Sequence, residues 1–573
     1  MRFPRGLLVL VCLFALSVAA TRATGEPSTT VRHPNFVLIL TDDQRWDTIG
    51  RCMGTFDATD LSAGRGACMP YLQKDLIAAG ITFLRGYVTT SLCCPSRTSI
   101  LTGRYAHHVG VWTNRLGFAL FDDSSTIATW LHTAGYRSGL FGKYLNGYGP
   151  LATSADYVPP GWDSWHALWG RFDYESFTLA ESDPGRPPAL KSYSVSGSPS
   201  SHACDRHNGY MTDQLCSQAR TFLAANTRRP FFLYFAPYSP HLPATPAARW
   251  KGFDDSVLTP RYPSYDTVPT PNTPSWLPTT PLSKAGQDTL SAEFRDQLDA
   301  NRAVDDAIDA LVAQLAGDGR LSDTVFIFLS DNGLAMGEHR LTGKSCEFEE
   351  CAHVPFVIAC PPAVCPGSAP GTIDASHAVL NIDLAPTIAA LAGVRPSTPV
   401  DGMSLVPLLN GSSAPWRSSF YIEDVTTHAR TLVGTVADVG GHTYKYVQLE
   451  NGDRELYDLT VDPFELANLV DPRIHQTIQH HLAASLGHVT PPSISITSAL
   501  TPSTNATFTW ASSEPADFEC SLDQLALSSC GSGSAGSASF TGLEAGRHVF
   551  VVRGTDRDGN IGGLTVVVFS VAI

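Results

Sequence analysis

The stretch NFVLILTDD, residues 35–43, sets the fold class of this 573-residue chain. Phe36–Leu40 are apolar without polar alternation, as in a strand that is buried on both faces of a sheet. The run ends at two adjacent carboxylates. Comparable runs, each predicted to contain a buried strand, occur at PFFLYFAPYSPH (230–241), TVFIFLSDNG (324–333) and VPFVIAC (354–360).

Helical patterns separate these runs. They lie at residues 69–80, 125–135 and 293–319, and the last ends at glycine. Strands that alternate with helices predict an α/β fold, with a mainly parallel sheet sandwiched by helices. Ligands of such sheets bind beyond the carboxyl ends of the strands. The predicted strands end in Asp-Asp, Asp-Asn and a histidine, so we expect the functional site there.

The composition changes twice along the chain. We predict an α/β domain over residues 33–400, in which the Pro-, Thr- and Ser-rich segment 242–290 forms a long surface loop. Short polar strands predict a small α+β subdomain over 401–490. From 492 to 573, alternating strands and Gly-Asp turns predict a separate β-sandwich, which resembles bacterial immunoglobulin-like repeats.

The N-terminus has the pattern of a secretory signal peptide. Arg2 and Arg5 precede an apolar run that ends at Ala20, and small residues follow. We predict a signal peptide over residues 1–23, the alternative being an uncleaved anchor, and a secreted, extracellular or periplasmic protein. No later stretch is long and apolar enough to span a membrane, so we predict no span after cleavage. The net charge of −15 argues against nucleic acid or an anionic membrane surface as a partner.

The cysteines divide into close neighbours and one adjacent pair. Of 13 cysteines, Cys12 lies in the signal peptide, and nearest-neighbour pairing is the simplest connectivity for ten others. These pairs are Cys52–Cys68, Cys204–Cys216, Cys346–Cys351, Cys360–Cys365 and Cys520–Cys530. Cys93 and Cys94 remain, either for chemistry or, alternatively, as a vicinal disulfide or two buried thiols.

The acidic residues at the strand ends suit a hard cation. Asp42 and Asp43 follow one strand, and Asp331 and Asn332 follow another, so parallel packing would bring four oxygen ligands together. Such a set suits Ca²⁺ or Mg²⁺. The alternative is that both dipeptides only cap turns.

The stretch SLCCPSRTSILTG, residues 91–103, predicts an anion site. Pro95 suits the first position of a helix, which would put Cys93 just before the helix N-terminus. Such an end attracts anions and activates a thiol, and Arg97 adds donors for an oxyanion. The alternative is an ordinary helix start with a solvated arginine.

The same stretch resembles the signature of type I sulfatases, in which the first cysteine of C-x-P-S-R is oxidised to formylglycine during export. GYRSGLFGKYL (135–145) resembles the second signature of that family, except that Phe141 replaces a smaller residue. NFVLILTDDQRWD, SDNGLAMGEHRLTGK and ELYDLTVDPFELANL match in the same order. The resemblance covers residues 35–485 and implies an alkaline-phosphatase-like fold, a sulfuric ester hydrolase activity and a formylglycine-generating enzyme as a partner.

Carried over to this chain, the resemblance implies a role for each matching residue. The implied Ca²⁺ ligands are Asp42, Asp43, Asp331, Asn332 and formylglycine at Cys93. Arg97 would steady the aldehyde hydrate, and Asp331 would draw its proton. Lys143 and Lys344 would bind sulfate, and His241 would act at the leaving oxygen. The alternatives are solvated lysines and a loop histidine that is satisfied by the backbone.

One departure concerns the base and the substrate. Many sulfatases have a histidine two residues after the lysine of the G-K motif, where this chain has Leu145, followed by Asn146. GKYLNGYG and YVPPGWDSWHAL instead resemble N-acetylglucosamine-6-sulfatases and related glycosaminoglycan sulfatases, which implies a sulfated carbohydrate as substrate. We expect Asn146 and His339 in substrate binding, and His339 or another histidine as the base.

Two other functions remain open. A phosphodiester or phosphonate hydrolase of the same superfamily would commonly need a second set of metal ligands, and none is evident in the sequence. An inactive carbohydrate- or surface-binding protein would work through its β-sandwich. The joint presence of Cys93, Arg97, Lys143, His241 and Lys344 argues against it.

Overall fold

A computed structural model describes most of the chain after the predicted signal peptide. The described residues are 33–571, except 53–59, 62–65, 151–152, 196–202, 206–208, 226–228, 269, 271, 426–430, 472–474, 488, 502–503 and 524–525. The predicted signal peptide lies outside them. Among the described helices, none combines the length and the apolar character needed to cross a membrane.

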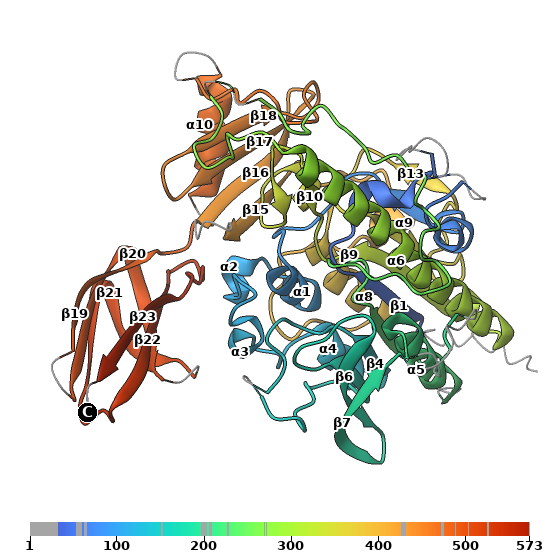
Figure 1. Cartoon of the computed structure of the whole chain (residues 1–573), viewed down its shortest axis with the longest axis horizontal. Coiled ribbons are helices and arrows are strands. Elements are labelled where there is room, and N and C mark those ends of the chain that lie inside the picture. Colours follow the sequence, from blue (N-terminus) through green and yellow to red (C-terminus); the bar gives the residue numbers. More distant parts are fainter. Residues whose placement is uncertain are drawn as a thin grey trace, which may run out of the picture. The chain divides into compact units, whose positions relative to one another are not determined.

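The fold is built around a ten-stranded sheet (Figure 1). In spatial order its strands are β13 (Thr372–Asp374), β2 (Ile81–Phe83), β12 (Phe356–Ala359), β9 (Thr324–Ser330), β1 (Asn35–Thr41), β8 (Phe231–Ala236), β4 (Arg137–Gly142), β5 (Ser164–Leu168), β6 (Ser176–Asp183) and β7 (Arg186–Ser194). Strands β9, β1, β8, β4 and β5 are parallel neighbours. The predicted mainly parallel α/β sheet is therefore confirmed, although β12 and β6 run antiparallel to their neighbours.

Helices cover both faces of this sheet because its strands are apolar on both faces. In β1, Phe36, Leu38 and Leu40 pack in one core with α1 (Cys93–Thr102), α4 (Ile127–Thr133) and α8 (Leu384–Ala392). Val37 and Ile39 point the other way. They pack in a second core with η2 (Leu72–Ile77), α5 (Met211–Ala225) and α6 (Lys284–Gly317).

Two helices begin earlier than the sequence predicts. Helix α6 starts at Lys284 rather than 293, because the Ser283 hydroxyl caps it by accepting a hydrogen bond from the Gly286 N–H. The predicted loop 242–290 is therefore too long at its C-terminal end. Helix α1 starts at Cys93, so Pro95 lies inside the first turn, where its missing N–H leaves no bond unmade.

The remaining elements of the α/β part are short. The helices are η1 (Trp46–Ile49), α2 (Ala106–Val109), α3 (Gly117–Leu120), η3 (Leu321–Asp323), α7 (Glu349–Ala352), η4 (Asn381–Asp383) and α9 (Val406–Leu409). Two small sheets pair β3 (Gly86–Tyr87) with β14 (Val379–Leu380) and β10 (Ala335–Met336) with β11 (Thr342–Gly343).

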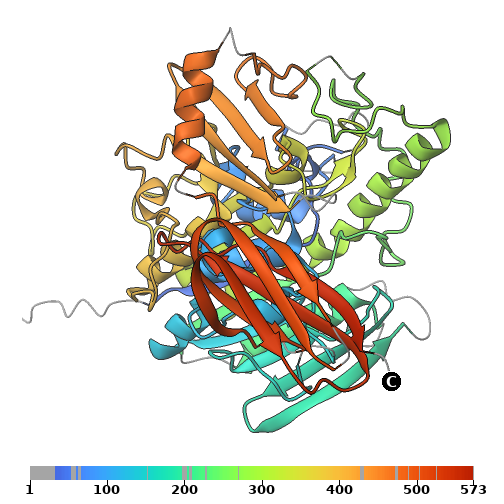
Figure 2. The ribbon, with the colours of Figure 1, turned by 90° about the vertical axis from the view of Figure 1, so that its left-hand side faces the viewer.

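The C-terminal third contains two antiparallel sheets (Figure 2). The first consists of β15 (Ser419–Val425), β16 (Thr431–Val439), β17 (His442–Leu449) and β18 (Arg454–Asp458), and α10 (Gln476–Leu486) packs on it through Leu482 and Leu486. The second consists of β19 (Ile494–Leu500), β20 (Ala506–Leu522), β21 (Ser528–Phe540), β22 (Gly546–Thr555) and β23 (Thr565–Val571).

The last sheet has its own core but is not divided into two separate sheets. The first half of β20 pairs with β19, its second half pairs with β22, and β21 runs along both halves. Phe508, Trp510, Phe518 and Phe550 fill the core. The all-β segment is thus present, formed by one sheet whose long strand β20 is shared by both ends.

The cysteine pairing follows the prediction. The disulfides are Cys52–Cys68, Cys204–Cys216, Cys346–Cys351, Cys360–Cys365 and Cys520–Cys530. Cys93 and Cys94 are free and buried. The alternative of a vicinal disulfide is therefore wrong for this structure.

Candidate active site

Four neighbouring strands of the central sheet end at one place. β9, β1 and β4 run directly into Asp331, Asp42 and Lys143, and the loop after β8 carries His241. The strands are parallel, so these side chains lie at the same edge. The side chains at the strand ends thus converge at the edge where such sheets bind their ligands.

The backbone turns sharply where β1 ends. Asp43 has a left-handed conformation with φ of 65°, which is uncommon for a residue other than glycine. The Asp43 N–H donates to Asp331 Oδ1 over 3.1 Å, and Asn332 Nδ2 donates to Asp43 Oδ1 over 2.7 Å. These bonds hold the turn and bring both strand ends into one cluster.

Cys93 faces this cluster from the first turn of α1. Its Sγ lies 3.5 Å from Asp42 Oδ1 and 3.8 Å from Asp43 Oδ1, and Lys344 Nζ approaches it to 2.9 Å. Burial raises the pKa of the Cys93 thiol to about 12, although Lys143 and Lys344 act in the opposite direction. Loss of water at this buried position therefore outweighs the two ammonium groups and favours the neutral thiol.

Three cations balance the three aspartates. Lys143 Nζ lies 2.5 Å from Asp42 Oδ2, and Lys344 Nζ lies 2.5 and 2.8 Å from the two Asp43 oxygens. Arg97 Nε donates to Asp331 Oδ2 over 2.7 Å, and its Nη1 donates to the Lys143 carbonyl over 2.8 Å. The solvated alternatives for Arg97 and Lys143 are wrong, because both side chains are buried.

These cations decide the charge of the aspartates. Burial alone would raise the pKa of Asp42, but Lys143, His241 and Arg97 outweigh it and lower the pKa to about 2. Burial also opposes the ionised form of Asp43, and Lys344 and His241 still lower its pKa. Both carboxylates are therefore ionised at neutral pH.

His241 lies on the open side of the cluster. Its Nε2 is 3.5 Å from Asp43 Oδ2, while its Nδ1 faces the Leu242 carbonyl at 2.6 Å and the Tyr238 hydroxyl at 2.7 Å. Sequence reasoning missed Tyr238. Its only signal was the place three residues before His241.

The cluster has the ligands that a hard cation requires. One ligand atom from each of Asp42, Asp43, Cys93 and His241 lies within 4.8 Å of the others. Asn332 Oδ1 is buried and has no hydrogen-bond partner among the described residues. An orphaned amide oxygen beside ionised carboxylates fits Ca²⁺.

Asn146 lies beside Cys94, the neighbour of Cys93, whereas His339 packs on Phe348. The Asn146 carbonyl oxygen lies 3.9 Å from Cys94 Sγ and accepts a hydrogen bond from the Phe118 N–H. The His339 ring stacks on Phe348 with centroids 3.9 Å apart, and its ligand atom lies within 4.8 Å of Glu350 and Glu465. Among the described residues, no hydrogen bond or ion pair joins either side chain to the strand-end aspartates.

Comparison with known protein families agrees with this geometry. The sulfatase family model matches residues 34–394, which is more than half of the chain. The chain belongs to the sulfatase family. A second model, for the C-terminal part of N-sulphoglucosamine sulphohydrolase, matches residues 337–491. The predicted enzyme class, a sulfuric ester hydrolase, is thereby confirmed.

Named sulfatases are among the relatives. The chain is 30% identical to the human N-acetylglucosamine-6-sulfatase over 528 residues, which is 83% of this chain and 87% of the human protein. It is 31% identical over 408 residues to an extracellular sulfatase SULF-1 homolog of Drosophila melanogaster. That match covers 68% of this chain but only a third (33%) of the length of the fly protein.

Solved structures share the fold. One, described as in complex with its substrate D-glucosamine-2-N,6-O-disulfate, superposes with a TM-score of 0.63 at 22% identity and covers 79% of this chain and 97% of its own. A phosphonate monoester hydrolase of Agrobacterium radiobacter gives 0.60 at 21% identity and covers 79% and 94%. At these identities the matches establish the fold and leave the substrate of this sulfatase to other arguments.

Proposed function

We propose that this sulfatase is secreted and removes sulfate from a sulfated sugar of the N-acetylglucosamine-6-sulfate type, using formylglycine at residue 93 and Ca²⁺. The observation that carries the proposal is the position of Cys93. It is a free, buried cysteine held among Asp42, Asp43 and Lys344. The substrate class is supported by the human N-acetylglucosamine-6-sulfatase, which aligns over most of both chains.

The cation would be held by Asp42, Asp43, Asp331, Asn332 and residue 93. When bound, Ca²⁺ would offset the negative charge of the sulfate group next to residue 93. Formylglycine would supply an aldehyde hydrate whose hydroxyl is a better nucleophile at this position than a buried neutral thiol. Both groups fit the donor set, because the orphaned Asn332 oxygen and the aspartates surround Cys93.

The chain's own residues would bind and orient the sulfate ester. Lys143 and Lys344 place two ammonium groups on the aspartates next to residue 93 and can bind sulfate oxygens. Arg97 is fixed by Asp331, and its Nη2 is buried without a hydrogen-bond partner among the described residues, so it can hold a hydroxyl at residue 93. Asp331 can take a proton from that hydroxyl. Fixed charges of this kind usually contribute most to such transfers.

His241 would complete the reaction on the leaving side. Its Nε2 faces Asp43 from the open side of the site, where the alcohol of the substrate would leave. A proton on Nε2 would pass to the alcohol oxygen as the sulfur–oxygen bond breaks, and the electron pair of that bond would stay on the oxygen. Such general acid catalysis contributes about 10² to 10⁴ in rate.

The domain and export predictions belong to the same proposal. The signal peptide, a formylglycine-generating enzyme as partner and the immunoglobulin-like character of residues 492–573 are supported by the sequence pattern. Five disulfides are consistent with an exported protein. The similarity to an extracellular sulfatase of the fly supports secretion as well.

Two measurements test the proposal. The first is the mass of the tryptic peptide GYVTTSLCCPSR (86–97) from protein exported by its own host. We expect residue 93 to have lost sulfur and gained a carbonyl, with only Cys94 open to alkylation. The second is sulfate release from N-acetylglucosamine-6-sulfate, abolished by a chelator and restored by Ca²⁺. Two intact thiols, or turnover of a phosphonate monoester without sulfate release, would overturn the proposal.

A further inference from the structure

Tyr238 contacts the histidine that faces the leaving side of the site. The two rings are stacked, with centroids 4.5 Å apart and an angle of 21° between their planes. The Tyr238 hydroxyl lies 2.7 Å from His241 Nδ1. A stacking contact and a hydrogen bond from one side chain fix both the position and the rotation of the imidazole.

The hydrogen bonds at Nδ1 decide which ring nitrogen faces the substrate. The Leu242 carbonyl, 2.6 Å from Nδ1, can only accept a hydrogen bond, so Nδ1 must carry a proton. The Tyr238 hydroxyl oxygen shares this N–H as a second acceptor. Nε2 is thereby left to hold and release the proton that the reaction needs, on the side of Asp43.

Tyr238 is itself held firmly. Its ring packs edge-on against Phe172, with centroids 5.0 Å apart, and lies tilted against the Tyr174 ring, with centroids 5.3 Å apart. The Tyr174 hydroxyl donates to the His241 carbonyl over 2.8 Å, which ties the backbone of the same loop. Burial, Asp42 and Asp43 raise the pKa of Tyr238, so its phenol stays neutral beside the aspartates.

The same ring also reaches the sulfate-binding side. Lys143 Nζ lies 5.8 Å from the centroid of the Tyr238 ring, within the range of a cation–π contact. Lys143 in turn pairs with Asp42. The Tyr238 ring therefore contacts both His241, the proposed proton donor, and Lys143, a proposed sulfate-binding residue.

We propose that Tyr238 is a positioning residue for His241: it orients the imidazole so that Nε2 delivers its proton to the leaving alcohol oxygen. This inference rests on the proposed function. In this proposal the phenol does not react with the substrate, and it acts only through its hydrogen bond to His241. The benefit is greatest for substrates whose leaving group cannot depart without a proton.

That dependence supplies a specific test. A sugar alkoxide is strongly basic and needs protonation as it leaves, whereas 4-nitrophenolate is stable as an anion and does not. Loss of a residue that acts through His241 should therefore harm hydrolysis of a sugar sulfate more than that of an aryl sulfate. A residue with only a structural role would harm both equally.

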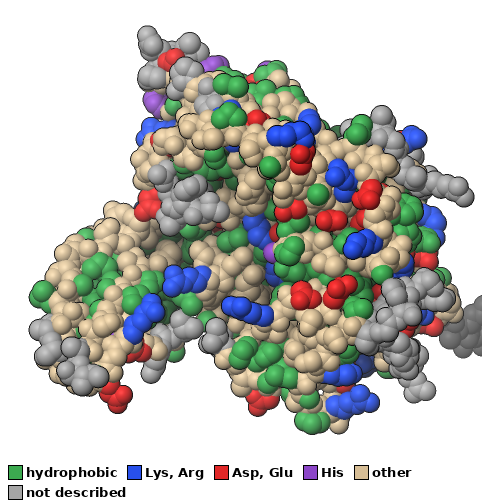
Figure 3. Space-filling model, viewed as in Figure 1, with side chains coloured by type: hydrophobic (Ala, Val, Ile, Leu, Met, Phe, Trp, Pro, Cys, Tyr) green, Lys and Arg blue, Asp and Glu red, His purple; other side chains and the backbone are tan. Residues whose placement is uncertain are grey.

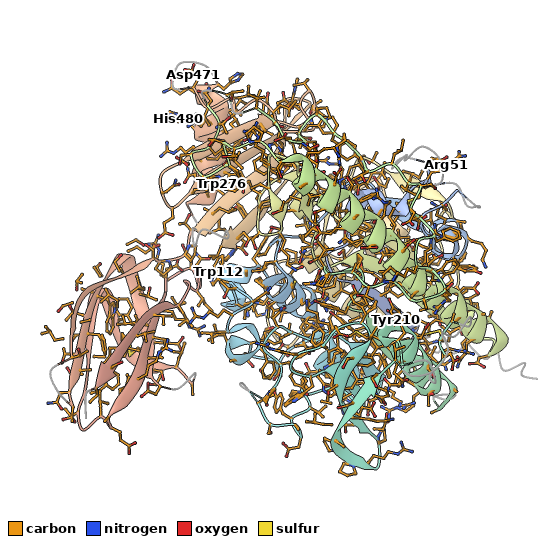
Figure 4. The ribbon with its side chains drawn as sticks, viewed as in Figure 1. Arg51, Trp112, Tyr210, Trp276, Asp471 and His480 are labelled. Carbon is orange, nitrogen blue, oxygen red and sulfur yellow. A yellow bond between two sulfur atoms is a disulfide. The ribbon has the colours of Figure 1, made fainter. Side chains whose placement is uncertain are left out.

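The experiment compares Tyr238→Phe with Tyr210→Phe in the full-length, host-exported enzyme. Tyr210, labelled in Figure 4, donates to the Thr245 carbonyl and stacks on Tyr174, so its variant removes a nearby buried hydroxyl that does not bond His241. For Tyr238→Phe we expect kcat/KM on N-acetylglucosamine-6-sulfate to fall about 10- to 100-fold and on 4-nitrophenyl sulfate less than about threefold. Tyr210→Phe should change both by the same small factor.

The same substitution in a protein that lacks His241 makes the result decisive. In His241→Ala protein, adding Tyr238→Phe should cost nothing further on the sugar sulfate, because the residue through which it acts is gone. Equal losses on both substrates, no loss, or full additivity with His241→Ala would overturn the positioning role. A wild-type enzyme that releases sulfate from neither substrate would instead refute the proposed function, so the two failures are distinguishable.

Discussion

Two buried groups of charged residues in this protein contain carboxyl groups whose pKa values shift in opposite directions. The strand-end cluster contains three aspartates and three cations, Asp42, Asp43, Asp331, Arg97, Lys143 and Lys344, around Cys93. The glutamate cluster contains Glu347, Glu349, Glu350, Glu455 and Glu465, and Lys445 is the ammonium that pairs within it. The first lies at the strand ends of the main sheet, and the second involves residues of β17 and β18.

The ratio of cations to carboxyl groups explains the difference. In the strand-end cluster the pKa of Asp42 falls to about 2 despite burial. In the glutamate cluster burial raises the pKa of Glu350 to about 8 and that of Glu465 to about 7. Glu349, which has Lys445 at 2.8 Å, has a lowered pKa. Buried carboxyl groups alone therefore do not indicate a site that binds an anionic substrate. Carboxylates that are matched by an equal number of cations do.

The same difference in charge argues against a metal ion at His339, Glu350 and Glu465. Their ligand atoms lie within 4.8 Å of one another. Glu465 already binds Lys445 Nζ over 2.7 Å and the Glu349 N–H over 2.8 Å, and Glu350 accepts from the Ser264 hydroxyl. The Lys445 ammonium therefore already supplies the positive charge that a metal ion would bring to Glu465.

The largest expected effect separates the two free cysteines. Cys93→Ala removes the precursor of the nucleophile, so we expect sulfate release to fall by about 10⁴-fold or more. Cys94→Ala, the matched control, deletes a buried thiol next to Gly117 and should keep activity within about tenfold while lowering stability. Steady-state assays of both exported variants check this. An equal loss of activity in both would mean that Cys93 is not the precursor of the nucleophile.

The next prediction makes the same substitution in both clusters. Lys344→Met takes an ammonium from Asp43 and Cys93, so kcat/KM should fall about 10²- to 10³-fold. Lys445→Met leaves Glu349 and Glu465 buried without their cation, so the free energy of unfolding should fall by about 3–5 kcal/mol while the folded fraction keeps its activity.

Urea titrations and assays on both lysine variants measure this contrast. Lys344 should cost less stability than Lys445, because its side chain is partly exposed and Arg97 and Lys143 remain. The comparison fails if Lys344→Met unfolds the protein at least as strongly as Lys445→Met, or if Lys445→Met inactivates protein that is still folded.

Local sequence predicted the strands whose apolar runs carry no competing signal. β1, β8 and β9 were predicted from such runs, and their ends then located Asp42, Asp331 and His241. The antiparallel direction of β12 was not predictable, because a short apolar run is the same read in either direction. The helix α6 was predicted too short, because the capping hydroxyl of Ser283 lies in a polar segment that reads as loop.

Contacts across the fold account for what the sequence left out of the site. Up to about 300 residues separate Cys93, Lys344 and the aspartates along the chain. Only the resemblance of their motifs to those of sulfatases predicted that they share one site. His339 or another histidine was expected as the base because Leu145 stands where many sulfatases have a histidine. The left-handed backbone of His339, with φ of 50°, instead accompanies a ring that packs on Phe348. Charged side chains of both signs share the visible surface (Figure 3), so surface charge alone would not have located the site.

The smallest expected effect concerns a shared proton in the glutamate cluster. Burial and the neighbouring Glu455, with which it shares a side-chain hydrogen bond, raise the pKa of Glu347 well above its usual value of 4.5. The native state therefore holds a proton that the unfolded state releases above pH 4.5. Its contribution to stability is complete below that pH and is lost as the pH rises towards the native pKa.

Glu347→Gln replaces the protonated carboxyl with a permanent neutral donor to Glu455. Relative to wild type, its free energy of unfolding should increase between pH 5 and pH 8 by on the order of 1–3 kcal/mol, as measured by urea titration at both values. Glu349→Gln is the control of opposite sign: the lowered pKa of Glu349 means that its charge stabilises the fold above pH 4.5, so this variant should be destabilised at both pH values. Parallel curves for Glu347→Gln and wild type would mean that Glu347 is ionised in the folded protein, and the contrast between the two clusters would then disappear.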